Sequence, residues 1–324
     1  VTHREHGVKT VLTRFEDYWD KDSPGNVDEI ILTPIKEDAT RVAALLSGDV
    51  DFISPVPPQD FKRLEDDANV KLFTYPGGRI ITLQLNQKRR PEFQKPEVRQ
   101  AIVHAINNEG IVKAIMKGTA TVAGQQSPKG YAGYNEALTP RYDLEKAKAL
   151  MKAAGLENGF EVTMIAPNNR YVNDEKIAEA VVSMLAKINI KVNLKTMPKA
   201  QYWDEFDAQV ADIQMIGWHS DTEDSGNFTE FLAMCPNKET GYGQYNSGNY
   251  CNPKVDELTL AAQVETDLDK RAEILKEIEK ILYDDAAFVP FHWQNHSYGA
   301  KKGIDAAPIL NTMNFPYFGD MVID

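Results

Sequence analysis

The sequence predicts an α/β protein, because strand-like and helix-like segments alternate along its central part. The alternation is clearest over residues 160–216, where short apolar runs are separated by amphipathic runs. This order is typical of βαβ units, in which a helix connects two parallel strands. The expected elements, beginning with a strand and then alternating, are 160–165, 174–187, 190–196, 200–208 and 212–216. With 324 residues, the chain can form one large or two medium domains.

The N-terminal part predicts shorter elements. A helix is expected at 38–48, with its apolar residues on one face and Gly48 at its end. A second helix, opened by proline, is expected at 57–64. Strands are expected at 8–14, 29–33, 51–53, 70–75 and 80–86. The pair Gly77-Gly78 lies between the last two of these strands, which predicts a hairpin turn.

The remaining elements are mostly helices. A helix is expected to begin after Asp143, whose side chain can cap it, and to end at Gly155. Other helices are expected at 95–106, 109–116, 253–264 and 268–282. Residues 117–142 are rich in turn-forming residues, and strand-like segments follow at 287–292 and 297–300. The sequence contains neither an internal repeat nor a low-complexity segment.

The composition excludes several classes of protein. The net charge is −12 and the isoelectric point is near 5.1, which argues against nucleic acid as a partner. No apolar run approaches the roughly 20 residues of a membrane-spanning helix, and no signal peptide is recognisable. The chain begins with Val1 and runs directly into a strand-like segment, so we expect a mature or truncated chain.

Two cysteines, Cys235 and Cys251, flank a segment that is rich in Gly and Asn and has no periodicity. A crosslink that closes about 15 residues removes roughly 3 kcal/mol of chain entropy from the unfolded state. We therefore expect a disulfide and an oxidising compartment. The alternative is two unrelated reduced thiols. A zinc site is disfavoured because two cysteines lack the partner spacing of such a site.

The segment 212–228 is the main candidate for a binding site. It is expected to form a buried strand that stops at Gly217 and leads Trp218 and Asp221 into a loop. In open α/β sheets, ligands bind at the carboxyl ends of the strands. An indole face beside a carboxylate suits a ligand with a positive charge, such as a free amine. The alternative is an ordinary polar surface loop.

Other motifs for chemistry are missing or weak. The sequence has no phosphate-binding glycine loop, no nucleophile elbow and no zinc-protease motif. His292 and His296 are four residues apart but are expected to flank the end of a strand, so neither a metal nor a cofactor is expected. A hydrolase could use Asp221 and Glu223, but acids on one loop rarely have the separation that glycoside hydrolysis needs. We therefore do not expect an enzyme.

Arg170 is a second candidate for ligand binding. It follows the predicted strand 160–165 and so lies at a strand's carboxyl end, like Asp221. An arginine there could hold a ligand carboxylate with two parallel hydrogen bonds, and the alternative is a surface arginine. Together, Asp221 and Arg170 could hold the two ends of a zwitterion.

At the level of whole motifs, the chain resembles the family 5 extracellular solute-binding proteins of ABC importers, which are dipeptide and oligopeptide receptors. The resemblance covers essentially the whole chain in the order of the family. The matching segments are Tyr18-Trp19, 38–51, Leu85-Asn86, 96–106, 142–150 and Gly217-Trp218.

This resemblance implies roles for the candidate residues. In the peptide receptors, the acid three residues after the tryptophan holds the amino terminus of the peptide, and Asp221 has that position. Cys235 and Cys251 match a disulfide loop that follows this site. Arg170 lies near an arginine that holds the peptide carboxylate, although the distance to the following helix is about two residues shorter here.

The implied fold is a two-lobed periplasmic binding protein of type II, of the cluster C kind, with an incomplete first lobe. Residues 1–84 and 297–324 would form part of lobe I, and residues 85–296 would form the ligand-binding lobe II. The implied function is periplasmic: a monomer binds a peptide-like solute between its lobes and delivers it to the permease of an ABC transporter. A nickel chelate, haem, an opine or an oligosaccharide is the alternative solute in the same fold.

Overall fold

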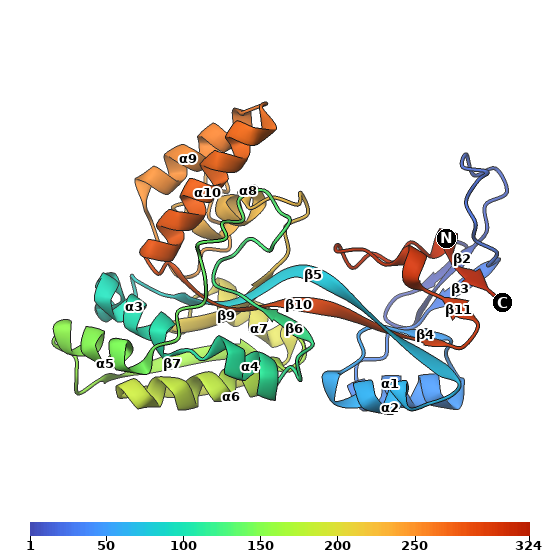
Figure 1. Ribbon diagram of the computed structural model, residues 1–324, viewed down its shortest axis with the longest axis horizontal. Coiled ribbons are helices and arrows are strands. Elements are labelled where there is room, and N and C mark those ends of the chain that lie inside the picture. The colour runs from blue at the N-terminus through green and yellow to red at the C-terminus, as the bar shows by residue number, and fades with distance from the viewer. The chain divides into compact units, whose positions relative to one another are not determined.

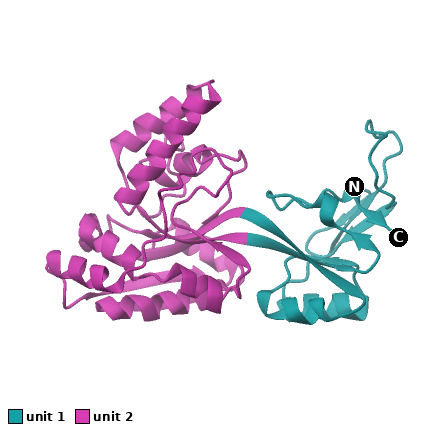
Figure 2. Cartoon of the chain, viewed as in Figure 1, with its two compact units in different colours: residues 1–77, 295–324 teal, residues 78–294 magenta.

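The computed structural model describes residues 1–324, which form two compact units (Figures 1 and 2). Unit 1 consists of residues 1–77 and 295–324, and unit 2 of residues 78–294. Strands β5 (Val70–Leu85) and β10 (Phe288–Lys301) each contribute residues to both units. The chain therefore passes from one unit to the other within regular strands.

Unit 1 is built from short elements. Its strands and helices are β1 (His3–Glu5), β2 (Lys9–Thr13), β3 (Glu29–Leu32), α1 (Asp38–Ser47), β4 (Phe52–Ile53), η1 (Pro58–Asp60), α2 (Phe61–Glu65), β11 (Ile304–Asp305), η5 (Ala307–Ile309), η6 (Phe318–Asp320) and β12 (Val322–Ile323). Strands β1, β2 and β3 form an antiparallel sheet, and β4 pairs with the end of β10. Helix α1 ends at Gly48, whose φ of 85° is the left-handed conformation expected of a glycine cap.

A small core stabilises unit 1. Helices α1 and α2 bury Leu45 and Leu64 against β10. Gly299 permits this close approach, since a Cβ there would lie 2.7 Å from a methyl carbon of Leu45. Each buried leucine contributes about 1.5–3 kcal/mol relative to an exposed one. The rest of the cluster consists of Val42, Ile53, Val56 and Val70.

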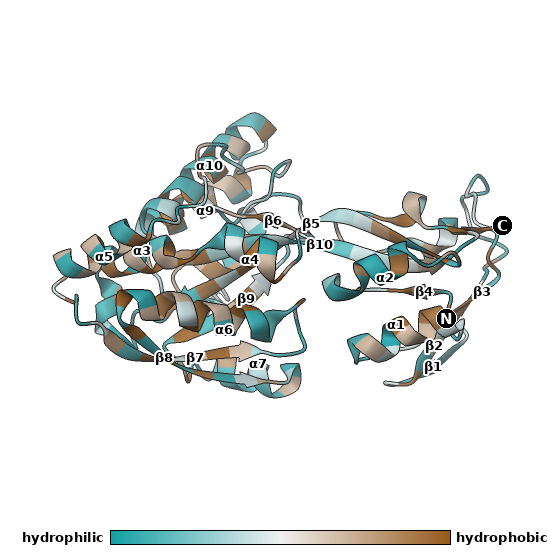
Figure 3. Cartoon of the chain, turned by 60° about the horizontal axis from the view of Figure 1, so that its bottom comes forward, coloured by the Kyte–Doolittle hydropathy of each residue, from teal (hydrophilic) through white to brown (hydrophobic).

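Unit 2 contains the longer elements. They are η2 (Pro91–Gln94), α3 (Pro96–Ala105), α4 (Asn108–Ala114), β6 (Ala120–Val122), α5 (Leu144–Ala153), β7 (Phe160–Pro167), α6 (Asp174–Leu185), η3 (Ala186–Ile188), β8 (Ile190–Met197), α7 (Lys199–Asp207), β9 (Ile213–Trp218), α8 (Gly226–Phe228), η4 (Thr229–Ala233), α9 (Pro253–Val264) and α10 (Leu268–Asp284). The helices combine hydrophilic and hydrophobic residues, as amphipathic helices do (Figure 3). No helix of the structure has the length and apolar character needed to cross a membrane.

The sheet of unit 2 is mixed. Its strands lie in the order β10-β5-β9-β7-β8, and β6 pairs with β10. Strand β7 is parallel to both β8 and β9, whereas β5 and β9 are antiparallel. The prediction of an α/β fold with parallel strands and crossover helices is therefore confirmed.

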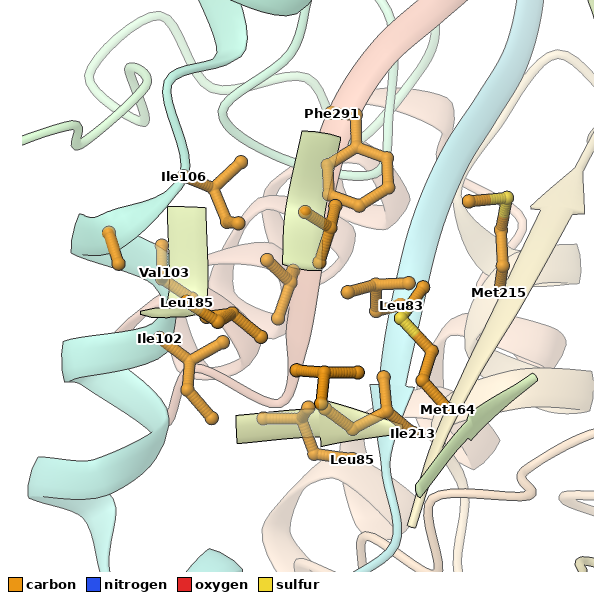
Figure 4. Packing of buried hydrophobic residues seen from close by; sticks show 14 of the residues in the cluster. Leu83, Leu85, Ile102, Val103, Ile106, Met164, Leu185, Ile213, Met215 and Phe291 are labelled. Carbon is orange, nitrogen blue, oxygen red and sulfur yellow. The ribbon is translucent and has the colours of Figure 1, made fainter. Parts of the chain in front are cut away.

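Residues on the two faces of this sheet enter different cores. One core contains Leu83 and Leu85 of β5 with Ile213 and Met215 of β9, packed against helices α3 and α6 (Figure 4). The other contains Ile80 and Ile216, together with residues of α7, α9 and α10. The alternation of side chains along a strand sends neighbouring residues to opposite faces. As a result, the end of β9 can present functional side chains to both faces.

Two sequence predictions about strand ends were wrong. Gly77-Gly78 forms no hairpin turn, because β5 runs unbroken from Val70 to Leu85 and neither glycine has a positive φ. Gly78 serves close packing instead, since a Cβ there would lie 2.5 Å from the hydroxyl oxygen of Tyr131. Residues 287–292 and 297–300 are likewise parts of one strand, β10, so His292 and His296 lie within it rather than beside its end.

Candidate functional site

The candidate segment begins at the end of β9. The strand extends one residue past Gly217 and pairs Trp218 with Ile80 of β5. The indole Nε1 of Trp218 donates a hydrogen bond to Asn227 Oδ1 over 2.8 Å. The half-buried indole also lies 5.6 Å from the ring of Phe231 and 5.3 Å from that of Tyr245. These contacts fix the orientation of Trp218 at the carboxyl end of a buried strand.

The loop after Trp218 is held by Asp224. Arg271 of α10 donates to Asp224 Oδ2 from two nitrogens, over 2.8 Å and 3.2 Å. Asp224 Oδ1 accepts a hydrogen bond of 2.8 Å from the backbone N–H of Gly226. The backbone of this loop also pairs with Ala132, which donates to the carbonyl of Glu223 and accepts from Ser225. Asp224 therefore has a structural role, and it is not available as a catalytic acid.

Asp221 differs from Asp224 in its exposure. Its side chain is 73% exposed, and His219 Nδ1 lies 3.5 Å away, a contact that is an ion pair only when the imidazole is protonated. The side chain of His219 is itself only 7% exposed. A carboxylate in this position can accept hydrogen bonds from a ligand without first breaking a buried ion pair.

A pocket lies directly beside Trp218. Its lining comes from β5, from the 126–131 loop and from the segment 218–228: Gly78, Ile80, Gln126, Ser127, Pro128, Tyr131, Trp218, Ser220, Asp224, Ser225 and Phe228. Two of its polar atoms, Gln126 Oε1 and Ser225 Oγ, are buried and make no hydrogen bond within the chain. Buried polar atoms are normally hydrogen-bonded, so these two atoms suit a polar group of a ligand.

Glu279 holds the loop that lines this pocket. It lies on α10, is 1% exposed, and accepts hydrogen bonds from the backbone N–H groups of Gln126 and Ser127 over 3.2 Å and 3.0 Å. Burial raises the pKa of Glu279 to about 8, against the opposing effect of these two hydrogen bonds. The indole of Trp293 also donates to the carbonyl of Gln126. The pocket loop is thus fixed by its backbone.

Arg170 lies in the connection between β7 and α6. Its backbone N–H and that of Tyr171 each donate to Asp174 Oδ2 over 2.9 Å, which fixes the start of α6. Burial raises the pKa of Asp174, while these hydrogen bonds act in the opposite direction. The guanidinium carbon of Arg170 lies 5.0 Å from the centre of the Tyr171 ring, and its Nε is buried without an acceptor.

Arg170 and Asp221 follow strands that end at the same edge of the sheet. Strand β7 runs parallel to β9, with Met164 beside Ile213. The carboxyl ends of parallel strands meet at one edge, so the loops that carry the two residues follow the same edge. The two residues need not lie on the same face, however, because Trp218 packs with one core and Tyr171 with the other.

Arg79 was not singled out from the sequence. It is half-buried on β5, immediately before Ile80, the partner of Trp218. Burial, and then the positive charge of Arg170, lower the pKa of Arg79, whereas Tyr171 and Asp221 raise it. Arg79 is therefore a neighbour of both predicted charged residues. Its position directly before the apolar pair Ile80-Ile81 was the signal that could have indicated it.

The disulfide prediction is confirmed. Cys235 and Cys251 are joined with an S–S distance of 2.08 Å. The closed segment carries Tyr245, whose ring contacts Trp218 and whose carbonyl accepts a hydrogen bond of 2.9 Å from Gln84 Nε2. The crosslink therefore helps to hold the Tyr245 ring against Trp218.

His292 belongs to unit 2 and His296 to unit 1. His292 is fully buried, and burial lowers its pKa to about 4. A ring nitrogen of His296 lies 2.8 Å from the carbonyl oxygen of Thr312. No group of three or more potential metal ligands is found in the structure.

Comparisons with known proteins agree on one family. The model for the middle part of the bacterial extracellular solute-binding proteins of family 5 matches residues 1–240. The dipeptide-binding protein of Escherichia coli K12 is 29% identical over 276 residues, which is 84% of this chain and 50% of that protein. The chain thus spans about half the length of the curated relatives it matches.

Two solved structures extend this similarity to the fold. The periplasmic binding protein DppA of Helicobacter pylori, in complex with the peptide STSA, is 25% identical with a TM-score of 0.86. The match covers 99% of this chain and 61% of DppA. The binding protein AgaA from A. tumefaciens R10, in complex with agropinic acid, is 29% identical with a TM-score of 0.83 and covers 99% of this chain and 66% of AgaA.

Proposed function

Because the chain belongs to the bacterial extracellular solute-binding proteins of family 5, we propose that it is the substrate-binding component of an ABC transporter. It binds a peptide-like solute in the periplasm, as a monomer, and delivers it to the permease in the inner membrane. It is a transport component and not an enzyme. We assign residues 1–84 and 297–324 to lobe I and residues 85–296 to lobe II, a division that differs from the two compact units at residues 78–84 and 295–296.

The observation that carries this proposal is the pairing of an exposed carboxylate with a fixed indole. Asp221 is 73% exposed and follows the strand that fixes Trp218. A free amino terminus would be neutralised by Asp221, while its apolar carbons pack on the indole. The pocket lined by Gln126 and Ser225 has room for about one water molecule, which would bridge these two side chains to the solute.

Calorimetric titration with a dipeptide and its N-acetylated form tests the role of Asp221. The receptor is used at its natural full length, with wild-type and Asp221→Asn proteins. Wild type is expected to bind the free dipeptide at least about tenfold more tightly than the acetylated form, since a charge-assisted hydrogen bond contributes about 1.5–3 kcal/mol. Asp221→Asn is expected to lose this difference. Equal affinity of the wild type for both forms would remove the amine-binding role.

The same fold supports a second candidate, an opine-like solute, because AgaA is among the similar structures and is described in complex with agropinic acid. A thermal-shift screen separates the two solutes, since a ligand that binds the native state raises the melting temperature. A shift with agropinic acid and none with any dipeptide would favour the opine.

A hydrolase that uses Asp221 and Glu223 is not favoured. Both side chains are exposed, and neither lines the pocket beside Trp218. Neighbouring acids on one loop also rarely have the separation across the bond that glycoside hydrolysis needs. Recovery of intact dipeptide after long incubation with the receptor is the expected result, and release of free amino acids would favour the hydrolase.

A further inference from the structure

Arg79 lies on the face of the sheet that is opposite to Trp218. Ile81, two residues along β5, pairs with Gly217, and alternation places the Arg79 side chain on the same face as Ile81. Tyr171 covers this face, because a Cβ on Gly217 would lie 2.6 Å from the Tyr171 ring and 2.7 Å from Ile81 Cδ1. Gly217 thus makes room for a tyrosine beside Arg79.

Arg170 is on the same side. Its guanidinium carbon is 5.0 Å from the centre of the Tyr171 ring. Burial raises the pKa of Tyr171, and the positive charges of Arg170 and Arg79 both oppose this effect. Two guanidinium groups therefore lie beside one buried tyrosine, near the carboxyl ends of strands β7 and β9.

Neither guanidinium group is held in a salt bridge of the chain. The carboxylate that raises the pKa of Arg79 is that of the exposed Asp221, and Arg170 Nε is buried without an acceptor. Two other enclosed arginines are satisfied, since the guanidinium of Arg99 donates to three backbone carbonyls and that of Arg271 donates to Asp224. Arg90 Nε is also buried without a hydrogen-bond acceptor, but it lies 3.6 Å from the Asp212 carboxylate. Like charges that lie together without acceptors lower stability, and such arrangements are typical of binding sites.

We propose that Arg79 and Arg170 form an anion site, and that the end of the solute bound there carries two carboxylates, as in a peptide with a C-terminal acidic residue. The inference rests on the proposed function and specifies its substrate class. Each guanidinium group can hold one carboxylate through two parallel hydrogen bonds. A solute with a single carboxylate neutralises one of the two charges, whereas a dicarboxylate neutralises both.

Two peptides that differ by one charge test this inference. Ala-Glu and Ala-Gln have nearly the same shape, and their affinities are measured calorimetrically with the full-length wild type, Arg79→Gln and Lys187→Gln. The wild type is expected to bind Ala-Glu about 10- to 100-fold more tightly. Arg79→Gln should bind the two peptides with about equal affinity. Lys187→Gln removes an exposed charge of the same unit and should keep the wild-type preference for Ala-Glu.

The possible outcomes distinguish failure of the anion site from failure of the proposed peptide-binding function. Equal affinities for both peptides in the wild type, or a preference that persists in Arg79→Gln, contradict the inference alone. Binding of neither peptide contradicts the proposed function and the inference together. Arg79→Lys keeps the positive charge but loses the planar guanidinium group, which can donate two parallel hydrogen bonds. Its preference for Ala-Glu over Ala-Gln should therefore lie between those of the wild type and Arg79→Gln.

Loss of folding is a separate and measurable outcome. Removal of one of two neighbouring like charges should leave the melting temperature of Arg79→Gln equal to or above that of the wild type. A lower melting temperature, with both peptides weakened alike, would show that Arg79 is a structural residue and contradict the inference.

Discussion

The rings of Trp218 and Tyr245 lie 5.3 Å apart and are tilted by 49°. Tyr245 belongs to the segment that the Cys235–Cys251 disulfide closes, so the crosslink bears on the candidate binding residue through one aromatic contact. Aromatic pairs of this kind contribute about 0.5–1.5 kcal/mol beyond the area they bury. The irregular loop therefore stabilises the orientation of the Trp218 indole through the packing of Tyr245 against it.

Replacing both Cys235 and Cys251 by serine should lower the free energy of unfolding by about 3 kcal/mol, because the unfolded chain regains the entropy of an open loop. Peptide affinity should fall as well, since Tyr245 is held less firmly against Trp218. Urea unfolding and calorimetry check the two effects. Treatment of the wild type with dithiothreitol is the control and should reproduce the behaviour of the variant. A double variant as stable as the oxidised wild type would contradict this prediction.

Arg271→Gln should loosen the loop that carries Asp221. The variant leaves the Asp224 carboxylate, which is 13% exposed, without its cation, and the expected loss of stability is about 1–3 kcal/mol. A double-mutant cycle with Asp224→Asn in urea should give a coupling above about 0.5 kcal/mol. Lys276→Gln breaks an exposed pair with Glu273 on the same helix and should cost less than about 1 kcal/mol. Similar losses for both single variants would argue against a special role for Asp224.

Glu279 should make stability depend on pH. In the unfolded chain this carboxyl ionises near 4.5, whereas burial raises its pKa in the folded protein to about 8. Between these values the folded state keeps a proton that the unfolded state has released. The contribution of Glu279 to the free energy of unfolding therefore falls as pH rises through this window.

The variant Glu279→Gln cannot ionise and should lose this slope. Urea unfolding of the wild type and the variant between about pH 5 and pH 8 measures the difference. Glu277→Gln, at an exposed position of the same helix, is the matched control and should retain the wild-type slope. Parallel pH profiles of the wild type and Glu279→Gln would refute the assignment.

Gly217→Ala should affect both stability and binding. The added Cβ would lie 2.6 Å from the Tyr171 ring and 2.7 Å from Ile81 Cδ1, so the tyrosine must move. Such overpacking costs about 1–3 kcal/mol. Because Arg170 adjoins Tyr171, the affinity for anionic peptides should fall too. The melting temperature and calorimetry are the readouts, and an unchanged melting temperature would show that the sheet accommodates a methyl group there.

Regular periodicity made most helices predictable. Helix α9 has the expected bounds, Pro253–Val264, because proline opens it and its apolar residues recur at helical spacing. The N-cap of α5 was also predicted, and Asp143 accepts a hydrogen bond from the backbone N–H of Lys146. These features depend on residues close in sequence, so the sequence alone is sufficient to indicate them.

The missed features depend on residues that are distant in sequence. Gly77-Gly78 has the composition of a turn, but β5 stays extended and Gly78 instead leaves room for Tyr131. The structural role of Asp224 was not evident from the sequence, because its partner Arg271 lies 47 positions away. Arg79 was overlooked because its neighbours come from the connections that follow β7 and β9. Tertiary packing decided each case.

The alternation of side chains along β5 and β9 bears on the path of the solute. Trp218 belongs to one core and Tyr171, which adjoins Arg170, to the other, so a molecule that contacts both aromatic residues must pass around the edge of one β-sheet. The two ends of such a solute would be recognised on opposite faces of the same sheet.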